Sequence, residues 1–222
     1  DFWSCSEDAS SWFFSEKILA GEKYKVIPNA IDVRKFERNN TVRYEVREEM
    51  GLKGKKVIGH VGRFHFQKNH KFLISVFTEL IKKDDNYQLI LVGQGELETE
   101  IKELVEKKGI TDKVTFCGVR NDLDRLYQAM DIFVLPSVFE GLAVVALEAQ
   151  ACLLPCLFSD TLPKKTKINS NVRFLSLEKG ANVWAEMIDF MVNTPEKVEN
   201  KILKSDYNIE TQVKNFEESL FE

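Results

Sequence analysis

From about residue 55 onward, short apolar runs alternate with longer segments that have the residue pattern of helices. The apolar runs, which we predict to be strands, lie at residues 57–61, 87–92, 114–117, 132–135, 154–159 and 172–175. Helices are predicted at residues 69–81, 96–108 and 122–130, from Gly141 onward, and at 184–192 and 209–220. Strands that are apolar throughout are buried on both faces, and strands joined by helices pair in parallel. The sequence therefore predicts an α/β fold, in which a Rossmann-like parallel sheet carries helices on both faces.

The first fifty residues do not follow this alternation. A short strand is predicted at residues 2–6, followed by a helix that Ser6 or Asp8 caps. Three large aromatic residues of this segment have no visible core of their own, and we expect them to be poorly buried or held by a neighbouring molecule: Trp3, Trp12 and Phe13. A second strand is predicted at residues 24–29, and a helix at residues 41–50 ends before Gly51, which suits a C-cap.

Composition excludes several classes of function. The 31 basic and 35 acidic residues give a net charge of -4, which indicates neither a nucleic-acid-binding surface nor a polybasic membrane patch. No apolar run approaches the ~18 residues needed to cross a bilayer, and no signal peptide is visible. The first residue is aspartate rather than methionine, so we expect a fragment or a processed chain. Four cysteines lack the spacing of metal ligands and are predicted to be reduced thiols of a cytosolic protein: Cys5, Cys117, Cys152 and Cys156.

The segment 139–149 carries the strongest chemical signal. Strong helix formers begin after Gly141, which places Glu140 in a strand-to-helix loop and Glu148 about two helical turns further on. The first turn of a helix leaves its N–H groups free at the positive end of the helix dipole, where an anion such as a phosphate binds. The amides expected to bind it are those of Gly141, Leu142, Ala143 and Val144. Carboxylates accept hydrogen bonds from sugar hydroxyls, so the two glutamates predict a nucleotide-sugar site.

The loop that follows the strand at 57–61 carries two cations at the same edge of the sheet, where ligands of such folds bind. Arg63 and Lys68 are placed to grip a diphosphate, although such charges in isolation are usually solvated surface residues. Asn69 is expected to start the next helix. We expect His70 to be a surface residue of its first turn rather than a catalytic base.

Two further loops are less specific. The turn at Gly93 resembles the start of a dinucleotide-binding fingerprint, but Glu98 occupies the third glycine position. This argues against an oxidoreductase with a Rossmann half and leaves a glycine turn beside a ligand cleft. The turn that contains Val119 and Arg120 offers backbone groups to a base edge, and Asp122 is expected to cap the following helix.

Together, these residues resemble the C-terminal, donor-binding half of family-4 glycosyltransferases, which have the two-domain B-type fold. The resemblance covers nearly the whole chain. Residues 28–32 are similar to the family's PNGID turn, and residues 62–63 with 68–70 are similar to its GR…KN loop. Glu140 and Glu148 have the spacing of its E-x7-E pair, and residues 159–164 resemble a capsular or exopolysaccharide subgroup.

This resemblance implies a cytoplasmic bacterial enzyme of polysaccharide biosynthesis. It would transfer a sugar, with retention and without a metal or other cofactor, from a nucleotide-diphosphate sugar to a glycan or lipid-linked acceptor. The subgroup favours a UDP-sugar as the donor. The implied catalytic residues are Glu140, Arg63 and Lys68. The implied nucleotide-sugar-binding residues are Gly62, Arg63, Lys68, Gly93, Val119, Arg120, Glu140, Gly141, Leu142, Ala143, Val144 and Glu148. Among these, Glu148 would bind the ribose and Glu140 the transferred sugar.

The same resemblance divides the chain into three parts. Residues 1–23 would be the remnant of an N-terminal domain and linker, residues 24–208 the nucleotide-sugar-binding domain, and residues 209–222 a helix that crosses back to the N-terminal domain. That missing acceptor-binding domain is an expected partner, so the chain alone is expected to be inactive. Peripheral contact of the complete enzyme with the inner face of the membrane stays open. A nucleotide-binding module without catalysis is the alternative.

Two positions depart from the family pattern. Leu153 follows the central helix where glycine is common, and Ala143 replaces a usual glycine or proline. If the backbone at position 153 is left-handed, leucine costs about 1–2 kcal/mol there. Neither substitution removes a group that binds a ligand.

Overall fold

The main body of the protein is a parallel sheet of six strands. The computed structural model describes residues 2–5, 10–11, 13–21 and 23–220. In this part of the chain the strands follow the order β5-β4-β3-β6-β7-β8, and every neighbouring pair is parallel. Their bounds are β3 (Lys56–Val61), β4 (Tyr87–Val92), β5 (Val114–Phe116), β6 (Ile132–Leu135), β7 (Cys156–Ser159) and β8 (Val172–Leu175). The predicted parallel sheet is confirmed.

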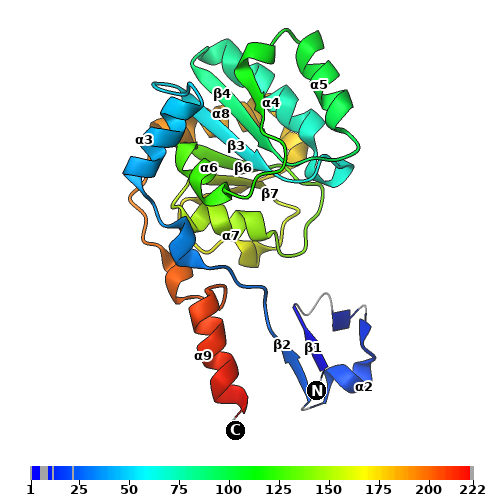
Figure 1. Cartoon of the computed structure of the whole chain (residues 1–222). Helices are drawn as coiled ribbons and strands as arrows, with labels where there is room; N and C mark the ends of the chain where they lie inside the picture. The colour runs from blue at the N-terminus through cyan, green and yellow to red at the C-terminus, as the bar shows by residue number, and fades with distance from the viewer. Residues whose placement is uncertain (1, 6–9, 12, 22, 221–222) are drawn as a thin grey trace.

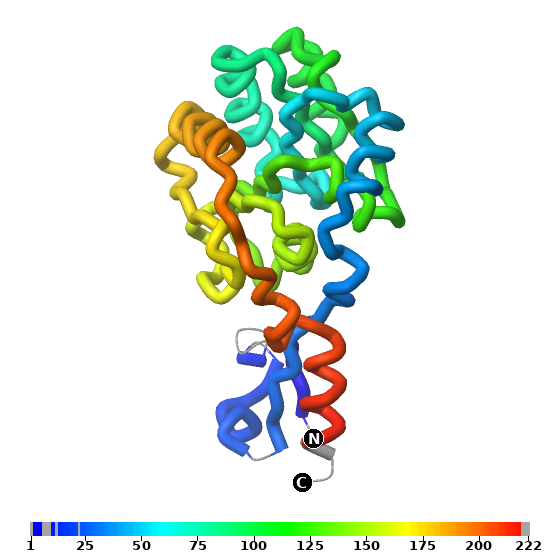
Figure 2. The backbone as a smooth tube through the Cα atoms, turned by 90° about the vertical axis from the view of Figure 1, so that its left-hand side faces the viewer, coloured from blue at the N-terminus to red at the C-terminus, as the bar shows by residue number. Residues whose placement is uncertain are grey.

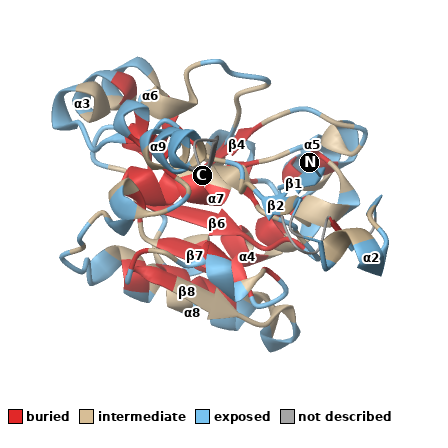
Figure 3. Ribbon diagram, turned by 90° about the horizontal axis from the view of Figure 1, so that it is seen from below, coloured by how far each residue is buried: buried red, intermediate tan, exposed pale blue. Residues whose placement is uncertain are grey.

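Helices cover both faces of this sheet (Figure 1). One apolar core packs α3 (Asn40–Glu49), α6 (Leu123–Ala129) and α7 (Val144–Ala151) against one face. A second core packs α4 (His70–Lys83), α5 (Glu98–Lys107) and α8 (Gly180–Asn193) against the other. Figure 3 shows that burial is concentrated on the central strands and on the inner sides of these helices. The sheet is therefore the middle layer of three, as strands buried on both faces require.

The strand order reverses beside β3. From β3 the chain proceeds outward through β4 and β5, whereas β6, which pairs with the other side of β3, begins the run to β7 and β8. The helices that follow β3 and β6 pack on opposite faces, α4 on one and α7 on the other, and doubly wound sheets bind their ligands at such a point.

One wrong boundary bears directly on the site. The helix after β6 was expected to begin just after Gly141, but α7 begins at Val144, with Ala143 as its N-cap residue. Residues 141–143 belong to the preceding loop, so Glu148 lies little more than one turn into the helix instead of two.

A smaller unit lies at one end of the molecule. Strands β1 (Phe2–Ser4) and β2 (Tyr24–Val26) pair in parallel, and the short helix α2 (Glu16–Leu19) lies between them in the sequence. Helix α9 (Ile209–Leu220) runs beside this unit, away from the large sheet (Figures 1 and 2). The ring of Trp3 meets the ring of Phe216 edge-on, with 5.1 Å between the centroids.

Poor burial of the N-terminal aromatic residues is confirmed where the structure describes them. Trp3 is 46% exposed and Phe13 is 83% exposed. Trp12 lies outside the described residues, as do Ser6 and Asp8, the two expected helix caps.

Candidate functional site

The loops after β3 and β6 meet through an ion pair. Lys68 closes the short 3-10 turn η2 (Phe66–Lys68), and its Nζ lies 2.6 Å from Oε1 of Glu140. The two side chains are only 15% and 7% exposed. The stem of Lys68 lies against Gly62, where an added Cβ would come within 3.0 Å of the lysine Cγ and Cδ. A largely buried ion pair thus joins two loops that are 72 residues apart in the sequence.

Neutral donors complete the surroundings of Glu140. Ser137 Oγ donates to Oε1 at 2.7 Å, and Gln67 Nε2 donates to Oε2 at 3.2 Å. Gln67 also binds the loop backbone. Its side-chain Nε2 donates to the carbonyl of Phe139 at 3.0 Å, and its own backbone carbonyl accepts from the amide of Val138 at 2.8 Å. The Glu140 carboxylate is therefore fixed by three side chains.

Two hydroxyls hold the base of this loop. Ser159 Oγ and Thr161 Oγ1 both donate to the carbonyl of Ser137, at 2.5 and 2.8 Å, and Ser159 is fully buried. The carboxyl end of β7 is in this way tied to that of β6. Sequence analysis did not predict this role, although both hydroxyls lie in the 159–164 motif. The available signal was a pair of hydroxyl side chains at the carboxyl end of a strand that neighbours β6.

Arg63 lies in the same loop as Lys68 but contacts another carboxylate. Its Nη2 lies 3.2 Å from Oε2 of Glu96, whose other oxygen is 3.5 Å from Nε2 of His65. The Arg63 side chain is 72% exposed. It borders an open cavity of about 750 Å³, which is also lined by Gly93, Gln94, Gly95 and Glu98. Arg63 is thus accessible, whereas Lys68 is enclosed.

Two glycines allow the loops after β3 and β4 to touch. A Cβ on Gly93, whose φ is +134°, would lie 2.1 Å from the carbonyl oxygen of Gly62. A Cβ on Gly95 would lie 2.5 Å from the carbonyl oxygen of Phe64. No side chain fits at either position, so this glycine pattern has a packing reason that does not depend on a ligand.

Glu148 lies in α7, on the other side of the β6 loop. Its Oε2 accepts a hydrogen bond of 2.9 Å from the hydroxyl of Tyr127 in α6. Burial raises the pKa of Glu148, and the hydrogen bond from Tyr127 and the charge of Lys35 act against this rise. Glu148 is half-buried, so its carboxyl group combines an apolar setting with partial access to solvent.

Three backbone donors of the loop after β6 are unpaired within the described part of the chain. The N–H groups of Gly141, Leu142 and Ala143 donate no hydrogen bond to another described residue. They precede the first turn of α7, whose dipole is positive at that end. The described loop therefore offers an anion-binding edge next to Glu140.

The loop after β5 carries a self-contained ion pair. Arg120 donates twice to the carboxylate of Asp122, at 2.8 and 2.7 Å, and the neighbouring Val119 is 63% exposed. Asp122 occupies the N-cap position of α6, but its side chain makes no capping bond. The expected cap is therefore wrong, because the arginine two residues earlier takes both carboxylate oxygens.

His70 is not a surface residue, so that prediction is also wrong. It is 2% exposed in the first turn of α4 and stacks on Phe64, with ring centroids 4.2 Å apart. Burial, with the nearby charge of Lys68, lowers the pKa of His70 to about 4. Asn69 does precede the helix, but its side chain makes no cap, since its backbone is left-handed with φ of 57°.

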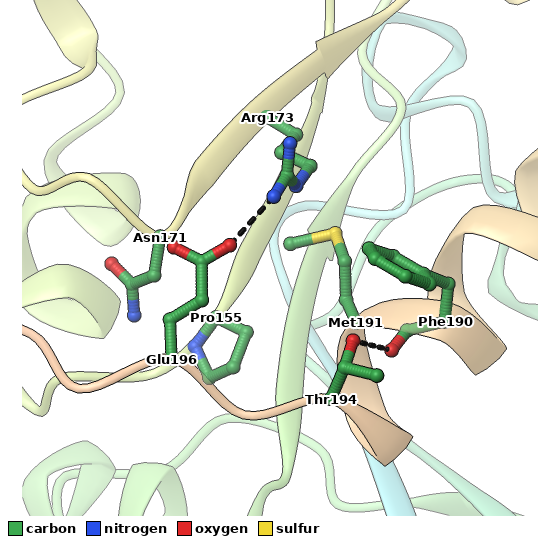
Figure 4. Close-up of a pocket in the computed structure, with 7 residues that line it drawn as sticks. All are labelled: Pro155, Asn171, Arg173, Phe190, Met191, Thr194 and Glu196. Carbon is green, nitrogen blue, oxygen red and sulfur yellow. Dashed lines mark hydrogen bonds and ion pairs between the residues drawn. The ribbon is translucent and has the colours of Figure 1, made fainter.

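A second pocket lies at the opposite edge of the sheet. It sits where β7 and β8 begin, next to the end of α8, and Figure 4 shows Met191 and Phe190 facing Pro155 and the Arg173–Glu196 pair. Arg173 Nη2 and Glu196 Oε1 are 2.6 Å apart, so its charges are already matched. Its cavity volume is only about 10 Å³, against about 750 Å³ beside Arg63, and none of the predicted site residues lines it.

The described residues form neither a metal-binding cluster nor a membrane-spanning helix. No group of three or more histidine, cysteine, aspartate or glutamate side chains there is arranged to hold a metal ion. No described helix combines the length and the apolar character needed to cross a membrane.

Sequence comparison identifies relatives of the chain. The family model described as "Glycosyl transferases group 1" matches residues 42–205. The putative glycosyltransferase EpsF of Bacillus subtilis is 37% identical over 187 residues, which are 83% of this chain and 49% of the relative. An Escherichia coli enzyme, UDP-Gal:alpha-D-GlcNAc-diphosphoundecaprenol alpha-1,3-galactosyltransferase, is 33% identical over 62% of this chain and 37% of its own. The chain thus spans half or less of the length of these two relatives.

Solved structures share the fold. Anabaena Alr3699/HepE in complex with UDP and glucose superposes with a TM-score of 0.78 at 21% identity, over 98% of this chain and 62% of that one. The C-terminal domain of the group 1 glycosyl transferase LpcC from Francisella tularensis gives 0.65 at 20% identity, over 84% of this chain and 98% of that one.

Proposed function

This chain belongs to the glycosyl transferases group 1 family, and we propose that it is the donor-binding domain of a retaining, metal-independent glycosyltransferase. The proposed reaction moves a sugar from a UDP-sugar to a glycan or lipid-linked acceptor in polysaccharide biosynthesis. One observation carries the proposal: Lys68, Glu140 and the unpaired amides of residues 141–143 lie at the point where the strand order reverses.

Charge development gives these groups their proposed roles. Negative charge builds on the diphosphate as the glycosidic bond breaks, and positive groups already in place stabilise it. Lys68 and Arg63 would bind the diphosphate together with the amides that precede α7. Both cations are neutralised by carboxylates in the free chain, so phosphate oxygens would replace Glu140 at Lys68 and Glu96 at Arg63.

The remaining site residues would bind the sugar and the nucleoside. Glu140, once released by Lys68, would accept hydrogen bonds from the transferred sugar, and Glu148 would accept them from the ribose. Val119 and Arg120 would lie beside the base. Gly62 and Gly93, which carry no side chain, would let the ligand approach the backbone closely.

The choice of nucleotide and acceptor rests on the relatives. The Anabaena protein was crystallised with UDP and with UDP-glucose, and the name of the E. coli relative states a UDP-galactose donor and a diphosphoundecaprenol acceptor. A UDP-sugar donor and a lipid-linked or glycan acceptor follow for this chain as proposals. Action in the cytoplasm, at the inner face of the membrane, belongs to the same proposal.

The proposed division of labour assigns the acceptor to another domain. Residues 24–208 would bind the donor, residues 1–23 would belong to an acceptor-binding domain and its linker, and residues 209–222 would cross back to that domain. The share of the relatives' length that this chain covers supports such a division. On this view the 222-residue chain binds the donor but transfers its sugar poorly or not at all.

Calorimetric titration with UDP-, GDP- and ADP-sugars tests the proposal. We expect saturable binding that is tightest for a UDP-sugar and weakened at least tenfold by Lys68→Ala. Lys113→Ala is the matched control, because Lys113 is equally enclosed, at 14% exposed, and pairs with Asp85 at 2.8 Å away from the site. Absence of binding to every nucleotide sugar, or equal losses in the two variants, would contradict the proposed site.

Glu140→Ala separates an enzyme from a nucleotide-binding module without catalysis. In a protein that contains the acceptor-binding domain, we expect the variant to lose transfer while it still binds nucleotide, because Lys68 remains. Absence of transfer in the unmutated protein would favour the module, whereas unchanged transfer in the variant would show that Glu140 is not a catalytic residue. Turnover by the 222-residue chain at the rate of a complete relative would overturn the division into donor and acceptor domains.

A further inference from the structure

Tyr127 is a fully buried polar side chain that none of the proposed steps uses. Its hydroxyl lies beneath α7, where its one proton is shared between Oε2 of Glu148 at 2.9 Å and the more distant carbonyl of Val145 at 3.2 Å. A single hydroxyl of α6 thus binds both the backbone and the carboxylate of the neighbouring helix.

The tyrosine ring cannot move easily. It meets Phe36 edge-on with 5.9 Å between centroids, and Phe133 edge-on with 5.8 Å. These contacts come from the 3-10 turn η1 (Val33–Phe36) and from β6, so the ring is packed from two directions. The position of its hydroxyl is therefore set by the core, and not by the flexible surface.

The hydrogen bond occupies one of the two oxygens of Glu148. The other, Oε1, has no hydrogen-bond partner among the described residues. A half-buried carboxylate needs hydrogen-bond partners to offset its lost hydration. Because the Tyr127 hydroxyl holds Oε2 in place, it also fixes the direction in which Oε1 points. An unheld glutamate side chain would instead sample several rotamers.

We propose that Tyr127 is a positioning residue: it holds Glu148 so that the free oxygen accepts a hydrogen bond from a ribose hydroxyl, which makes the site prefer ribonucleotides to deoxyribonucleotides. This inference rests on the proposed function, which places the nucleoside beside Glu148. A site built to bind a hydroxyl discriminates strongly against a ligand that lacks it, because the buried acceptor is left unpaired. That discrimination weakens once the acceptor is free to turn away.

The test compares UDP with 2′-deoxy-UDP and 3′-deoxy-UDP by calorimetric titration of the 222-residue chain. We expect the wild-type chain to bind UDP at least tenfold more tightly than one of the deoxy analogues. Tyr127→Phe keeps the ring and its packing but removes the hydroxyl, and we expect that ratio to fall below threefold. Glu148→Gln should reduce it as well.

The pH profile of the same ratio gives a second readout. Protonation of the diphosphate does not change this affinity ratio, because all three nucleotides carry the same diphosphate. The charged or titratable groups that face Glu148 are Tyr127 from α6 and Lys35 from η1. Tyr127 favours the charged carboxylate, so its loss raises the pKa of Glu148 further. In Tyr127→Phe the ribose preference should therefore fade at a higher pH than in the wild type.

Tyr87→Phe is the matched control. Tyr87 is also fully buried, and its hydroxyl donates to the Asp189 carboxylate at 2.8 Å, but the contact joins β4 to α8 on the other face of the sheet. It should destabilise the chain comparably and leave the ribose ratio unchanged.

Each outcome decides between the two proposals. If Tyr127→Phe keeps both the ratio and its pH profile while Glu148→Gln loses the ratio, the positioning role is wrong and the nucleotide site stands. If Tyr87→Phe lowers the ratio as much as Tyr127→Phe, the effect is loss of stability and the inference is overturned. A wild-type chain that binds no nucleotide would overturn the proposed function, and the inference with it.

Discussion

Three imidazole nitrogens lie buried beneath the loop that contains Arg63 and Lys68. His60 Nε2 and both ring nitrogens of His70 have no hydrogen-bond partner, while His60 Nδ1 donates to the carbonyl of Val134 at 2.8 Å. A ring that donates from one nitrogen and lacks an acceptor at the other is stable only when neutral. Burial accordingly holds the pKa of His60 well below its usual value and lowers that of His70 to about 4.

This burial predicts acid lability. In the unfolded chain His70 binds a proton near pH 6.5, whereas in the folded chain it binds one only near pH 4, so stability present above pH 6.5 is lost as the pH falls. His70 contributes about 1.4 kcal/mol per pH unit in that window. We expect His70→Phe to lower the slope of unfolding free energy against pH by about one proton, measured by urea unfolding between pH 6.5 and 4.5.

Phe77→Leu is a suitable control for that experiment. Phe77 is fully buried in the same helix, and its replacement removes volume without removing a titratable group. The control should lower stability by a similar amount at every pH. If His70→Phe leaves the wild-type slope intact, His70 is not neutral in the folded chain.

A left-handed residue ends α7. Leu153 has φ of +58°, as the expected glycine at this position implied, and it directly follows the C-cap residue Cys152. We expect Leu153→Gly to raise the unfolding free energy by about 1 kcal/mol in chemical denaturation, because the left-handed cost of leucine slightly exceeds the entropy cost of glycine. The reverse change at the same position of α5, Gly109→Ala with φ of +66°, should lower it by a similar amount. A loss of stability in Leu153→Gly would show that contacts of the leucine side chain outweigh the strain.

At the scale of elements, packing between loops shapes the site as much as the strands do. The loops after β3 and β4 approach so closely that two glycines replace side chains at the contact. In Gly95→Ala the new Cβ would lie 2.5 Å from the Phe64 carbonyl oxygen, so one loop must move. We expect a loss of about 1–3 kcal/mol in unfolding free energy, the usual cost of overpacking, together with weaker nucleotide binding.

Gly141→Ala controls for the removal of a glycine from a loop. A Cβ at Gly141 has nothing within 4 Å and its φ is not positive, so stability should change by less than about 0.5 kcal/mol. Equal losses in both variants, measured by thermal unfolding, would show that the contact with Phe64 is not the cause.

The elements were predictable from the sequence because apolar periodicity reports burial directly. All six strands of the large sheet followed from continuous apolar runs, and their parallel pairing followed from the helices between them. The error at His70 was avoidable, since His70, Leu73, Ile74 and Phe77 form one buried stripe with helical spacing. Side-chain pairing was not predictable in the same way. Periodicity does not tell which carboxylate Arg63 or Lys68 meets, and the Ser159 contact to Ser137 depends on strand neighbours that are 22 residues apart.

At the scale of the whole molecule, the chain consists of a well-packed sheet domain and a small N-terminal unit that has few buried side chains. The two cores of the sheet domain contain its largest fully buried side chains, such as Trp184 and Phe133. Ser10 is the only buried residue among those described in β1, β2 and the segment between them. Backbone hydrogen bonds between Ile31 and residues 207–209 join the segment that leads from β2 into the sheet domain to the start of α9.

This contrast predicts that the two parts open independently. A two-stranded sheet with few buried side chains is marginal in water, whereas the central strands open only with global unfolding. In hydrogen exchange of the isolated chain, we expect β1 and β2 amides to exchange at least about a thousandfold faster than those of β3, β4 and β6, which corresponds to about 4 kcal/mol of opening free energy. Trp3→Ala removes the ring that contacts Phe216 and should leave the midpoint of thermal unfolding unchanged. If β1 and β2 are instead as protected as β3, the terminal unit is an integral part of one cooperative fold, and its exposed aromatic residues need no covering domain.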